Sequence, residues 1–274
     1  MIKTVNETIL SGLMIYPVKS LAGIELNQSE VDHFGLRHDR RWMVVNAAGK
    51  FLSQRELPQM ALIRQTLTAD GLTLSTDGKP DLHLPLTPLE TNRIEVEVWH
   101  DHCQAIPCGS KADTWLSDAL GQPCRLVFFP DGEERPVDLE YAEPQDRTAF
   151  SDGFPLLLIS EASLEDLNAR LEQKLPMSRF RPNLIVRGCN AYAEDNWHRI
   201  RIGELDCRVV KPCSRCTITT VDTETGQRGP EPLKTLAGYR WQGNKVFFGQ
   251  NLLHNGPGFL EAGMPVEILD KTDG

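Results

Sequence analysis

The alternation of apolar and polar residues predicts short strands through most of the chain. Residues 94–99 read Ile-Glu-Val-Glu-Val-Trp, a period-two pattern typical of a strand with one buried face and one solvated face. Between about residues 60 and 100, leucines recur in similar short runs that are separated by Asp-Gly turn signals at positions 70–71 and 77–78. This region is expected to form an antiparallel sheet or barrel.

Uniformly apolar or β-branched runs predict the remaining strands. They cover residues 9–17, 42–45, 125–129, 156–159, 199–202, 207–210, 217–221, 246–248 and 266–269. The runs at 199–202 and 207–210 should form a hairpin around Gly203-Glu204. Gly249-Gln250-Asn251 is expected to interrupt the strand that precedes it.

Two short helices are expected between the strands. Residues 111–120 carry apolar side chains on one side and stop at Gly121. Ser163 is expected to cap a second helix, with Asp166 three residues later as in a capping box. The predicted fold class is therefore mainly β, of α+β type, with a domain boundary in the acidic, turn-rich segment 130–150.

The composition is that of an ordinary soluble globular protein, and its charge argues against some classes of partner. Of 274 residues, 40% are hydrophobic and 24% are charged, and the formal net charge is -9. Nucleic acids and anionic membranes attract positively charged surfaces, so neither is expected as a partner. No apolar run approaches the roughly 18–20 residues of a membrane span. The first ten residues do not resemble a secretory signal, so a cytoplasmic location is expected.

Cysteine chemistry centres on one short segment. The seven cysteines are irregularly spaced, which does not suggest a disulfide framework. Two of them lie three positions apart in Lys211-Pro212-Cys213-Ser214-Arg215-Cys216, with one cation between them and another just upstream. Neighbouring cations favour the thiolate, which is the form of cysteine that attacks or binds a metal.

Three interpretations of Cys213 and Cys216 compete. A zinc site lacks its other ligands, because the sequence has no second Cys-x-x-Cys and no histidine pair with zinc-finger spacing. A redox disulfide of thioredoxin type would normally open a helix, whereas residues 217–221 are expected to form a strand. In the third interpretation, one thiolate is a soft ligand to a metal carried by a cofactor, whose phosphate is held by nearby basic groups.

Basic clusters elsewhere in the chain offer that anion-binding chemistry. They are Lys19 with Ser20, Arg37 with Arg40, and Arg179 with Arg181, each in a loop beside an expected strand. Arginine can hold a phosphate in bidentate fashion. Each cluster alone is also consistent with a solvated turn or a salt-bridged strand end, but convergence at one end of a barrel would give all three a common purpose.

Five segments carry a family resemblance. They are Tyr16-Pro17-Val18-Lys19-Ser20, Asp39-Arg40-Arg41-Trp42, Phe180-Arg181-Pro182-Asn183, Pro212-Cys213-Ser214-Arg215-Cys216 and Phe248-Gly249-Gln250. In this order they resemble the MOSC family, named for the C-terminal domain of molybdenum cofactor sulfurase, over nearly the whole chain. Within that family the chain is most similar to the mitochondrial amidoxime-reducing components and the bacterial hydroxylaminopurine-resistance proteins.

The resemblance implies both a fold and a reaction. It implies a MOSC-associated β-barrel domain over residues 1–130 and a MOSC β-barrel domain over residues 131–274, with a few short helices. It also implies an oxidoreductase that uses molybdenum cofactor to reduce small N-hydroxylated compounds in detoxification, namely amidoximes, hydroxylamines and N-hydroxylated bases. One alternative is a protein that carries molybdenum cofactor or sulfur without catalysing a reduction. Another is a module whose basic pocket binds some other phosphorylated ligand.

The resemblance also implies site residues. Cys216 is expected to be the molybdenum ligand and catalytic residue, with Cys213 as a neighbour that does not bind the metal. The residues expected to hold the molybdenum–molybdopterin cofactor are Lys19, Ser20, Arg40, Gly153, Phe154, Arg181, Asn183, Ser214, Arg215, Cys216 and Asn251. Asn251 stands where the mitochondrial members carry a tyrosine, and Asp222 is hypothesised to relay a proton near the thiolate.

A separate electron donor is expected. Some bacterial relatives continue into a ferredoxin-like domain with four cysteines, whereas this sequence ends at Gly274 without one. Either a separate partner supplies the electrons, for which a ferredoxin-like protein or a flavin reductase is expected, or the sequence is truncated before such a domain.

Overall fold

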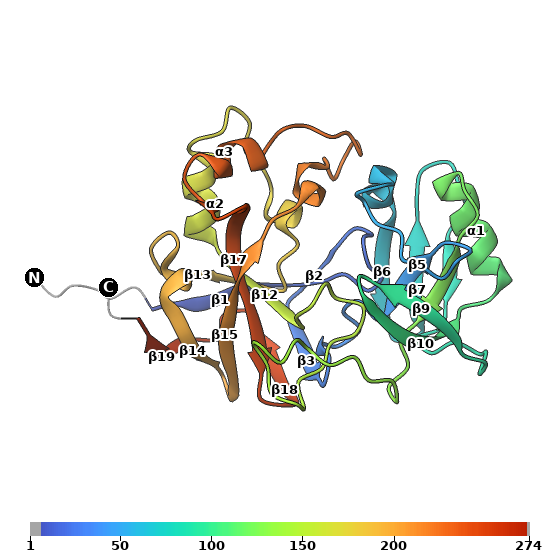
Figure 1. Ribbon diagram of the computed structural model, residues 1–274, viewed down its shortest axis with the longest axis horizontal. Helices are drawn as coiled ribbons and strands as arrows, with labels where there is room; N and C mark the ends of the chain where they lie inside the picture. The colour runs from blue at the N-terminus through green and yellow to red at the C-terminus, as the bar shows by residue number, and fades with distance from the viewer. Residues whose placement is uncertain (1–6, 273–274) are drawn as a thin grey trace, which may run out of the picture.

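Strands dominate the computed structural model, which describes residues 7–272. Figure 1 shows two β-rich lobes side by side. The first lobe contains β5 to β11 and α1, and the second lobe contains β12 to β19 with α2 and α3. The prediction of a mainly β fold with a few short helices is confirmed.

Within the described residues, a nine-stranded sheet forms the second lobe. Its order is β19-β14-β15-β17-β12-β13-β1-β2, with β16 paired to β17. The strands are β1 Ile9–Ile15, β2 Ile24–Leu26, β12 Leu156–Ser160, β13 Leu184–Arg187, β14 Trp197–Ile202, β15 Leu205–Ser214, β16 Trp241–Gln242, β17 Lys245–His254 and β19 Val266–Lys271. The pairing of β12 with β13 is parallel and the others are antiparallel.

Three smaller sheets complete the β structure of residues 7–272. The first lobe holds β5 Trp42–Val45, β9 Ile94–Val98, β10 Asp101–Pro107 and β11 Arg125–Phe128 in one sheet, and β6 Arg64–Thr68, β7 Gly71–Ser75 and β8 Leu82–Leu84 in another. The third sheet, β18-β3-β4, joins β18 Gly258–Glu261 to β3 Gln28–Asp32 and β4 Gly35–Leu36.

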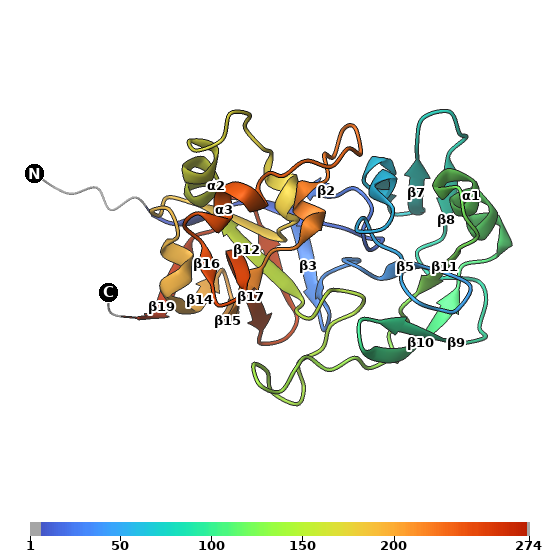
Figure 2. The ribbon, with the colours of Figure 1, turned by 45° about the horizontal axis from the view of Figure 1, so that its top comes forward.

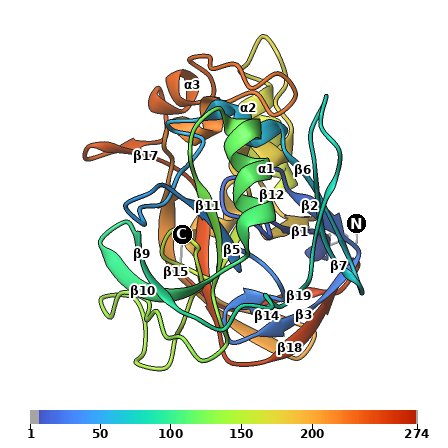
Figure 3. The same cartoon turned by 90° about the vertical axis from the view of Figure 1, so that its right-hand side faces the viewer.

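The helices are short and lie on the sheets or between strands. The α-helices are α1 Ser110–Leu120, α2 Glu161–Asn168 and α3 Leu233–Ala237. The 3-10 helices are η1 Pro58–Leu62, η2 Met177–Phe180, η3 Ala193–Asn196 and η4 Thr217–Thr220. Helix α1 packs on β11 and β8 and ends at Gly121 in the left-handed conformation, as its sequence predicted (Figure 3).

The N-terminal strands bind the two lobes together. Strand β1 pairs with β13, so the chain begins in the second lobe before it builds the first. Figures 1 and 2 show β2 and β3 at the junction of the two lobes. The loop after β1 places Val18 and Leu21 in the core of the first lobe, while Leu13 and Ile15 lie in the core of the second. The boundary between residues 130 and 131 stays a prediction.

Three local predictions in the second lobe are wrong, and the first concerns the cap of α2. Helix α2 is capped by Ser160, whose Oγ accepts the backbone N–H of Ser163 at 3.1 Å. The hydroxyl of Ser163 donates instead to buried Glu194, at 2.7 Å. Asp166 pairs with Arg170 along the helix and takes no part in a cap. Ser163 is therefore the third residue after the true cap, and the buried carboxylate of Glu194 accepts the hydroxyl that was expected to cap the helix.

Residues 217–220 form the 3-10 helix η4, so the predicted strand is wrong as well. Thr219 Oγ1 donates to the carbonyl of Cys216 at 3.0 Å, and Thr220 Oγ1 donates to that of Thr217 at 2.8 Å. Such side-chain bonds to the local backbone compete with strand pairing and here outweigh the β propensity of the threonines.

Strand β17 continues through Gly249 and is not interrupted there, contrary to prediction. Ser214 pairs with Phe247 and Pro212 pairs with Gln250, so β17 carries one extra residue opposite Cys213. Gly249 has φ +82 in this bulge, a conformation that favours glycine. The bulge therefore bends the sheet beside the two cysteines.

Gly249→Ala is expected to destabilise the protein by about 3 kcal/mol, because left-handed backbone and overpacking costs add. A Cβ there would lie 2.6 Å from Ile159 Cγ1 and 2.9 Å from the carbonyl oxygen of Leu158. The matched control is Gly243→Ala, since Gly243 has φ +59 and nothing within 4 Å of its Cβ position. Urea unfolding should show a loss of about 1 kcal/mol for the control. Equal losses would contradict the packing argument.

Candidate functional site

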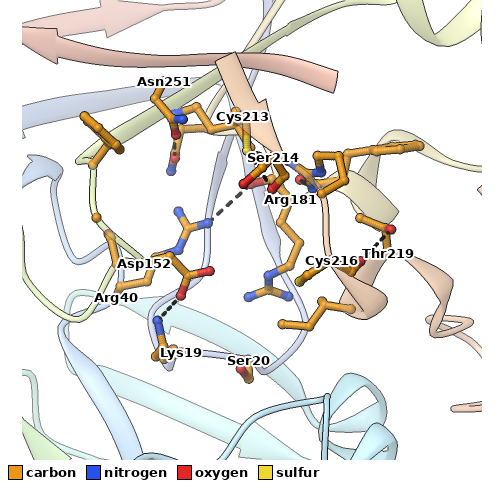
Figure 4. Close-up of a pocket in the computed structure, with 18 of the residues that line it drawn as sticks. Lys19, Ser20, Arg40, Asp152, Arg181, Cys213, Ser214, Cys216, Thr219 and Asn251 are labelled. Atoms are coloured by element: carbon orange, nitrogen blue, oxygen red, sulfur yellow. Dashed lines mark hydrogen bonds and ion pairs between the residues drawn. The ribbon is translucent and has the colours of Figure 1, made fainter. Parts of the chain in front are cut away.

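All eleven residues predicted for the cofactor site line one cleft (Figure 4). Its walls come from the loops that follow β1, β4 and β5, the loop before β12, the turn between η2 and β13, the segment from β15 to η4, and the middle of β17. The enclosed volume is about 120 Å³, so a larger ligand would extend into the open mouth of the cleft.

The two cysteines lie where β15 leaves the sheet. Cys213 is near the end of β15, and Cys216 is the N-cap residue of η4. The backbone N–H of Arg215 donates to the carbonyl of Val246 at 2.8 Å, which holds the intervening turn against β17. The bulge in β17 and this bond together direct both thiols into the cleft.

Each thiol has its own guanidinium. Arg215 Nη1 donates to Cys213 Sγ at 3.0 Å, and Arg55 Nη2 donates to Cys216 Sγ at 3.2 Å. Arg215 also donates to the carbonyl of Phe180 at 2.5 Å. Its buried Nε has no partner among the residues that the structure describes, so the side chain keeps an unused donor at the site.

Two arginines share the ring of Tyr16. The guanidinium carbons of Arg40 and Arg181 lie 4.3 and 4.0 Å from the ring centroid. Arg40 also pairs with buried Asp39, and Arg181 donates to the carbonyl of Leu21 at 2.7 Å. Burial raises the pKa of Tyr16 to about 12 and lowers that of Arg181 to about 10, so the ring stays neutral and the guanidinium stays charged at neutral pH.

The backbone of the cleft is strained at three predicted site residues. Ser20, Arg40 and Arg181 have φ values of +69, +49 and +57. The left-handed region costs roughly 1–2 kcal/mol for a residue with a side chain. Strain of this kind persists where surrounding contacts hold it, and it gathers at functional sites.

Lys19 and Asp152 form an ion pair across the junction of the lobes. Lys19 is 5% exposed and also donates to the carbonyl of Phe150 at 2.7 Å. Burial lowers the pKa of Lys19 to about 8, although Asp152 works in the opposite direction. Desolvation opposes ionisation of Asp152, but Lys19 outweighs it and holds the pKa of that carboxyl well below its ordinary value.

Both asparagines of the predicted set contact backbone. Asn183 Nδ2 donates to the carbonyl of Met14 at 3.1 Å, and its Oδ1 accepts the N–H of Leu157 at 3.2 Å. Asn251 Nδ2 donates to the carbonyl of Lys211 at 3.2 Å. Asn183 therefore ties β1 to β12 behind the cleft, while Asn251 braces the two strands that carry the cysteine segment.

Some residues grouped with the site in the sequence lie elsewhere. Arg37 pairs with Glu30 and lines a different cleft. Arg179 is buried, donates to the carbonyl of Thr219 and pairs with Asp222 at 3.2 Å. The other oxygen of Asp222 accepts bonds from its own turn, and Asp222 does not line the cleft, so the structure gives no support to a proton relay.

Sequence reasoning missed Arg55, which contacts Cys216 directly. It lies in a turn after β5, two residues after Ser53, and nothing in its local sequence marks it as part of the site. Phe180 and Thr219 also line the cleft and were not assigned to the site. The contact of Arg55 depends on how the lobes meet, which no local pattern encodes.

The chemistry of the cleft suits an anion beside a thiol. Its lining contains five cations, which are Lys19, Arg40, Arg55, Arg181 and Arg215, against one carboxylate. All seven cysteines are free. Among the described residues, no group of three or more His, Cys, Asp or Glu side chains is placed to hold a metal.

The chain matches two family descriptions, a MOSC N-terminal beta barrel domain over residues 7–123 and a MOSC domain over residues 145–267. Mitochondrial amidoxime-reducing component 1 of Mus musculus is 40% identical, covering 94% of this chain and 82% of that protein. The Homo sapiens protein of the same name is 39% identical with the same coverage. Molybdenum cofactor sulfurase of Oryza sativa subsp. japonica is 34% identical over 90% of this chain, but only 32% of that protein is covered.

Anion binding in the cleft should weaken as pH rises through about 8, because Lys19 then loses its charge. Sulfate is a suitable probe, since it stays doubly charged across this range. Titration calorimetry of cofactor-free protein should show affinity falling between pH 7 and 9, and Lys19→Met should bind roughly fivefold more weakly at pH 7 with a flatter profile. Lys111→Met, at an exposed position of α1, is the matched control. Wild-type affinity that stays constant to pH 9 would refute the assignment.

Proposed function

This chain belongs to the MOSC family, and on that premise we propose that it is a molybdenum-cofactor-dependent reductase of small N-hydroxylated compounds. Its relatives are named amidoxime-reducing components and molybdenum cofactor sulfurase, which supports a molybdenum-cofactor-associated function. The observation that carries the proposal is the convergence of Cys216 with five cations from both lobes in one cleft.

The residues present fit such a cofactor. A molybdenum–pterin group combines an anionic phosphate with a thiophilic metal, and the cleft offers guanidinium groups, an ammonium and two thiols. The unused buried Nε of Arg215 is a further donor for an anion. Because the enclosed volume is small, the group would extend through the open mouth of the cleft. Gly153 and Phe154 also line the cleft and would contact the group.

Each residue has a proposed role. Cys216 would be the metal ligand, and Lys19, Arg40, Arg181 and Arg215 would neutralise the phosphate. Ser20 and Ser214 would donate hydroxyl groups to the cofactor, and Asn251 would lie beside it. Asn183 would act by fixing the cleft wall, because its amide is used by backbone groups. The molybdenum centre would supply two-electron chemistry, and the protein would supply position and electrostatic field.

The reaction needs an outside supply of electrons. Conversion of N–OH to N–H and water consumes two electrons and two protons, and we propose that a separate ferredoxin-like protein or flavin reductase delivers the electrons. Amidoximes, hydroxylamines and N-hydroxylated bases are the proposed substrates, and detoxification is the proposed role.

Location and other partners remain predictions. The net charge of -9 disfavours nucleic acid and anionic membranes as partners. Within residues 7–272, no helix combines the length and apolar character that crossing a membrane requires. The cytoplasmic location expected from the sequence stays a prediction, and the amidoxime-reducing relatives are named mitochondrial.

A second candidate is a carrier of molybdenum cofactor or of sulfur. It is favoured by the two thiols of Cys213 and Cys216 in one cleft, each beside a guanidinium that would stabilise a negatively charged sulfur. A carrier would bind the cofactor, or a sulfur atom on Cys216, and pass it to an acceptor without turnover.

Cys216→Ala is expected to abolish molybdenum binding, whereas Cys213→Ala should keep it, because only Cys216 is the proposed ligand. Protein from cofactor-competent cells should hold about one molybdenum per chain in the wild type. Wild type and Cys213→Ala should reduce benzamidoxime with a reduced dye, and Cys216→Ala should not. Bound molybdenum without turnover would favour the carrier. Absence of molybdenum from folded wild type, in a host shown to make cofactor, would refute the reductase and would favour a sulfur carrier or a protein that binds another phosphorylated ligand.

A further inference from the structure

Arg55 is the residue through which the first lobe contacts the proposed metal ligand. Its Nη2 lies 3.2 Å from Cys216 Sγ and 3.9 Å from an Asp152 oxygen. Cys216 and Asp152 belong to the second half of the chain, whereas Arg55 is delivered by the loop after β5. One guanidinium nitrogen thus bridges the thiol and the carboxylate of the cleft.

The backbone of Arg55 is held from three sides. Its N–H donates to Ser53 Oγ at 3.2 Å, and the neighbouring Gln54 side chain donates to the carbonyl of Ser20 at 2.7 Å. Arg228, from the segment after η4, donates to the carbonyls of both Gln54 and Arg55. A solvated turn arginine would need none of these contacts, so the turn is built to keep Arg55 in place.

The side chain of Arg55 is fixed by a strained tryptophan. Its guanidinium carbon lies 4.4 Å from the ring centroid of Trp99, a cation–π contact. Trp99 sits in the turn between β9 and β10 with φ +60, where a bulky residue carries a backbone penalty. Its Nε1 donates to Asp152 at 3.1 Å, and its ring packs against Phe51. The strained backbone of Trp99 is therefore tolerated in a turn that places this ring beside the cleft.

We propose that Arg55 is a positioning residue for Cys216, which fixes the direction of its sulfur and withdraws electron density from it. A hydrogen bond to a metal-bound sulfur is one of the means by which proteins set the potential of a metal centre. The effect on the metal rests on the proposed function, whereas the contact with the sulfur does not. The counterpart pair, Arg215 with Cys213, comes from a single strand end and provides an internal comparison.

The first test uses cofactor-free protein and compares two alkylating reagents at one fixed pH. Iodoacetate is an anion and iodoacetamide is neutral, and both attack the same thiolate, so the ratio of their rates reports local charge and not protonation. Arg55→Ala should lower this ratio at Cys216 by roughly threefold to fivefold, as expected for the loss of one nearby charge. Arg55→Lys should restore most of the ratio, and Arg64→Ala, an exposed arginine of β6, should leave it unchanged.

Peptide mapping in the same experiment gives the ratio of the two alkylation rates at Cys213, which is the control thiol. An unchanged ratio at Cys216 in Arg55→Ala would overturn the proposal. An equal fall at Cys213 would overturn it too, since the cleft would then have changed as a whole. A fall confined to Cys216 in a protein that binds no molybdenum would support the contact while the proposed function fails.

The second test uses protein loaded with molybdenum and measures the midpoint potential of the metal by redox titration with spectroscopic detection. Arg55→Ala should shift the potential to more negative values, because the sulfur regains electron density, and Arg55→Lys should lie between wild type and Arg55→Ala. Identical potentials in all three proteins would refute the tuning role.

Discussion

The cleft can form only if the fold holds several positively charged side chains close together. Five cationic side chains line one cleft, and their mutual repulsion must be offset by the fold. Arg40 and Arg181 both make cation–π contacts with the Tyr16 ring, and buried Asp39 forms an ion pair with Arg40. Lys19 is offset by Asp152. Strained backbone at Ser20, Arg40 and Arg181 is a second cost, so the cleft is stabilised by packing elsewhere.

That packing comes from both lobes at once. The loop after β1 contributes Val18 and Leu21 to the core of the first lobe, while β1 itself pairs with β13 in the large sheet. Lys19 and Ser20 therefore sit on a segment anchored at both ends in different cores. Neither lobe alone would form the cleft, because each lobe supplies charged groups that are balanced by groups of the other lobe. This explains why the cations are scattered over so much of the sequence.

How far the sequence predicted this arrangement differs between local and long-range features. Alternating and apolar runs predicted most strands correctly, and the family resemblance implied eleven residues that share one cleft. The cap of α2 was misplaced because the hydroxyl of Ser163 donates to Glu194, which lies 31 residues away in the sequence, and Ser160 caps the helix instead. Threonine side chains turned 217–220 into a 3-10 helix. Arg55 was not predicted as a site residue, because its contact with Cys216 forms only when the two lobes pack together.

The two thiols of the cleft differ in what controls them. Cys213 is paired with Arg215, two residues away on the same segment, so their contact follows from local geometry. Cys216 is paired with Arg55, which is held by Trp99 and Arg228 from two other segments. Any relative movement of the lobes would therefore change the surroundings of Cys216 before those of Cys213. The charge environment of Cys216 is set by groups from both lobes, which suits a ligand whose electronic properties must be tuned. The surroundings of Cys213 are set by its own segment, which suits a local role.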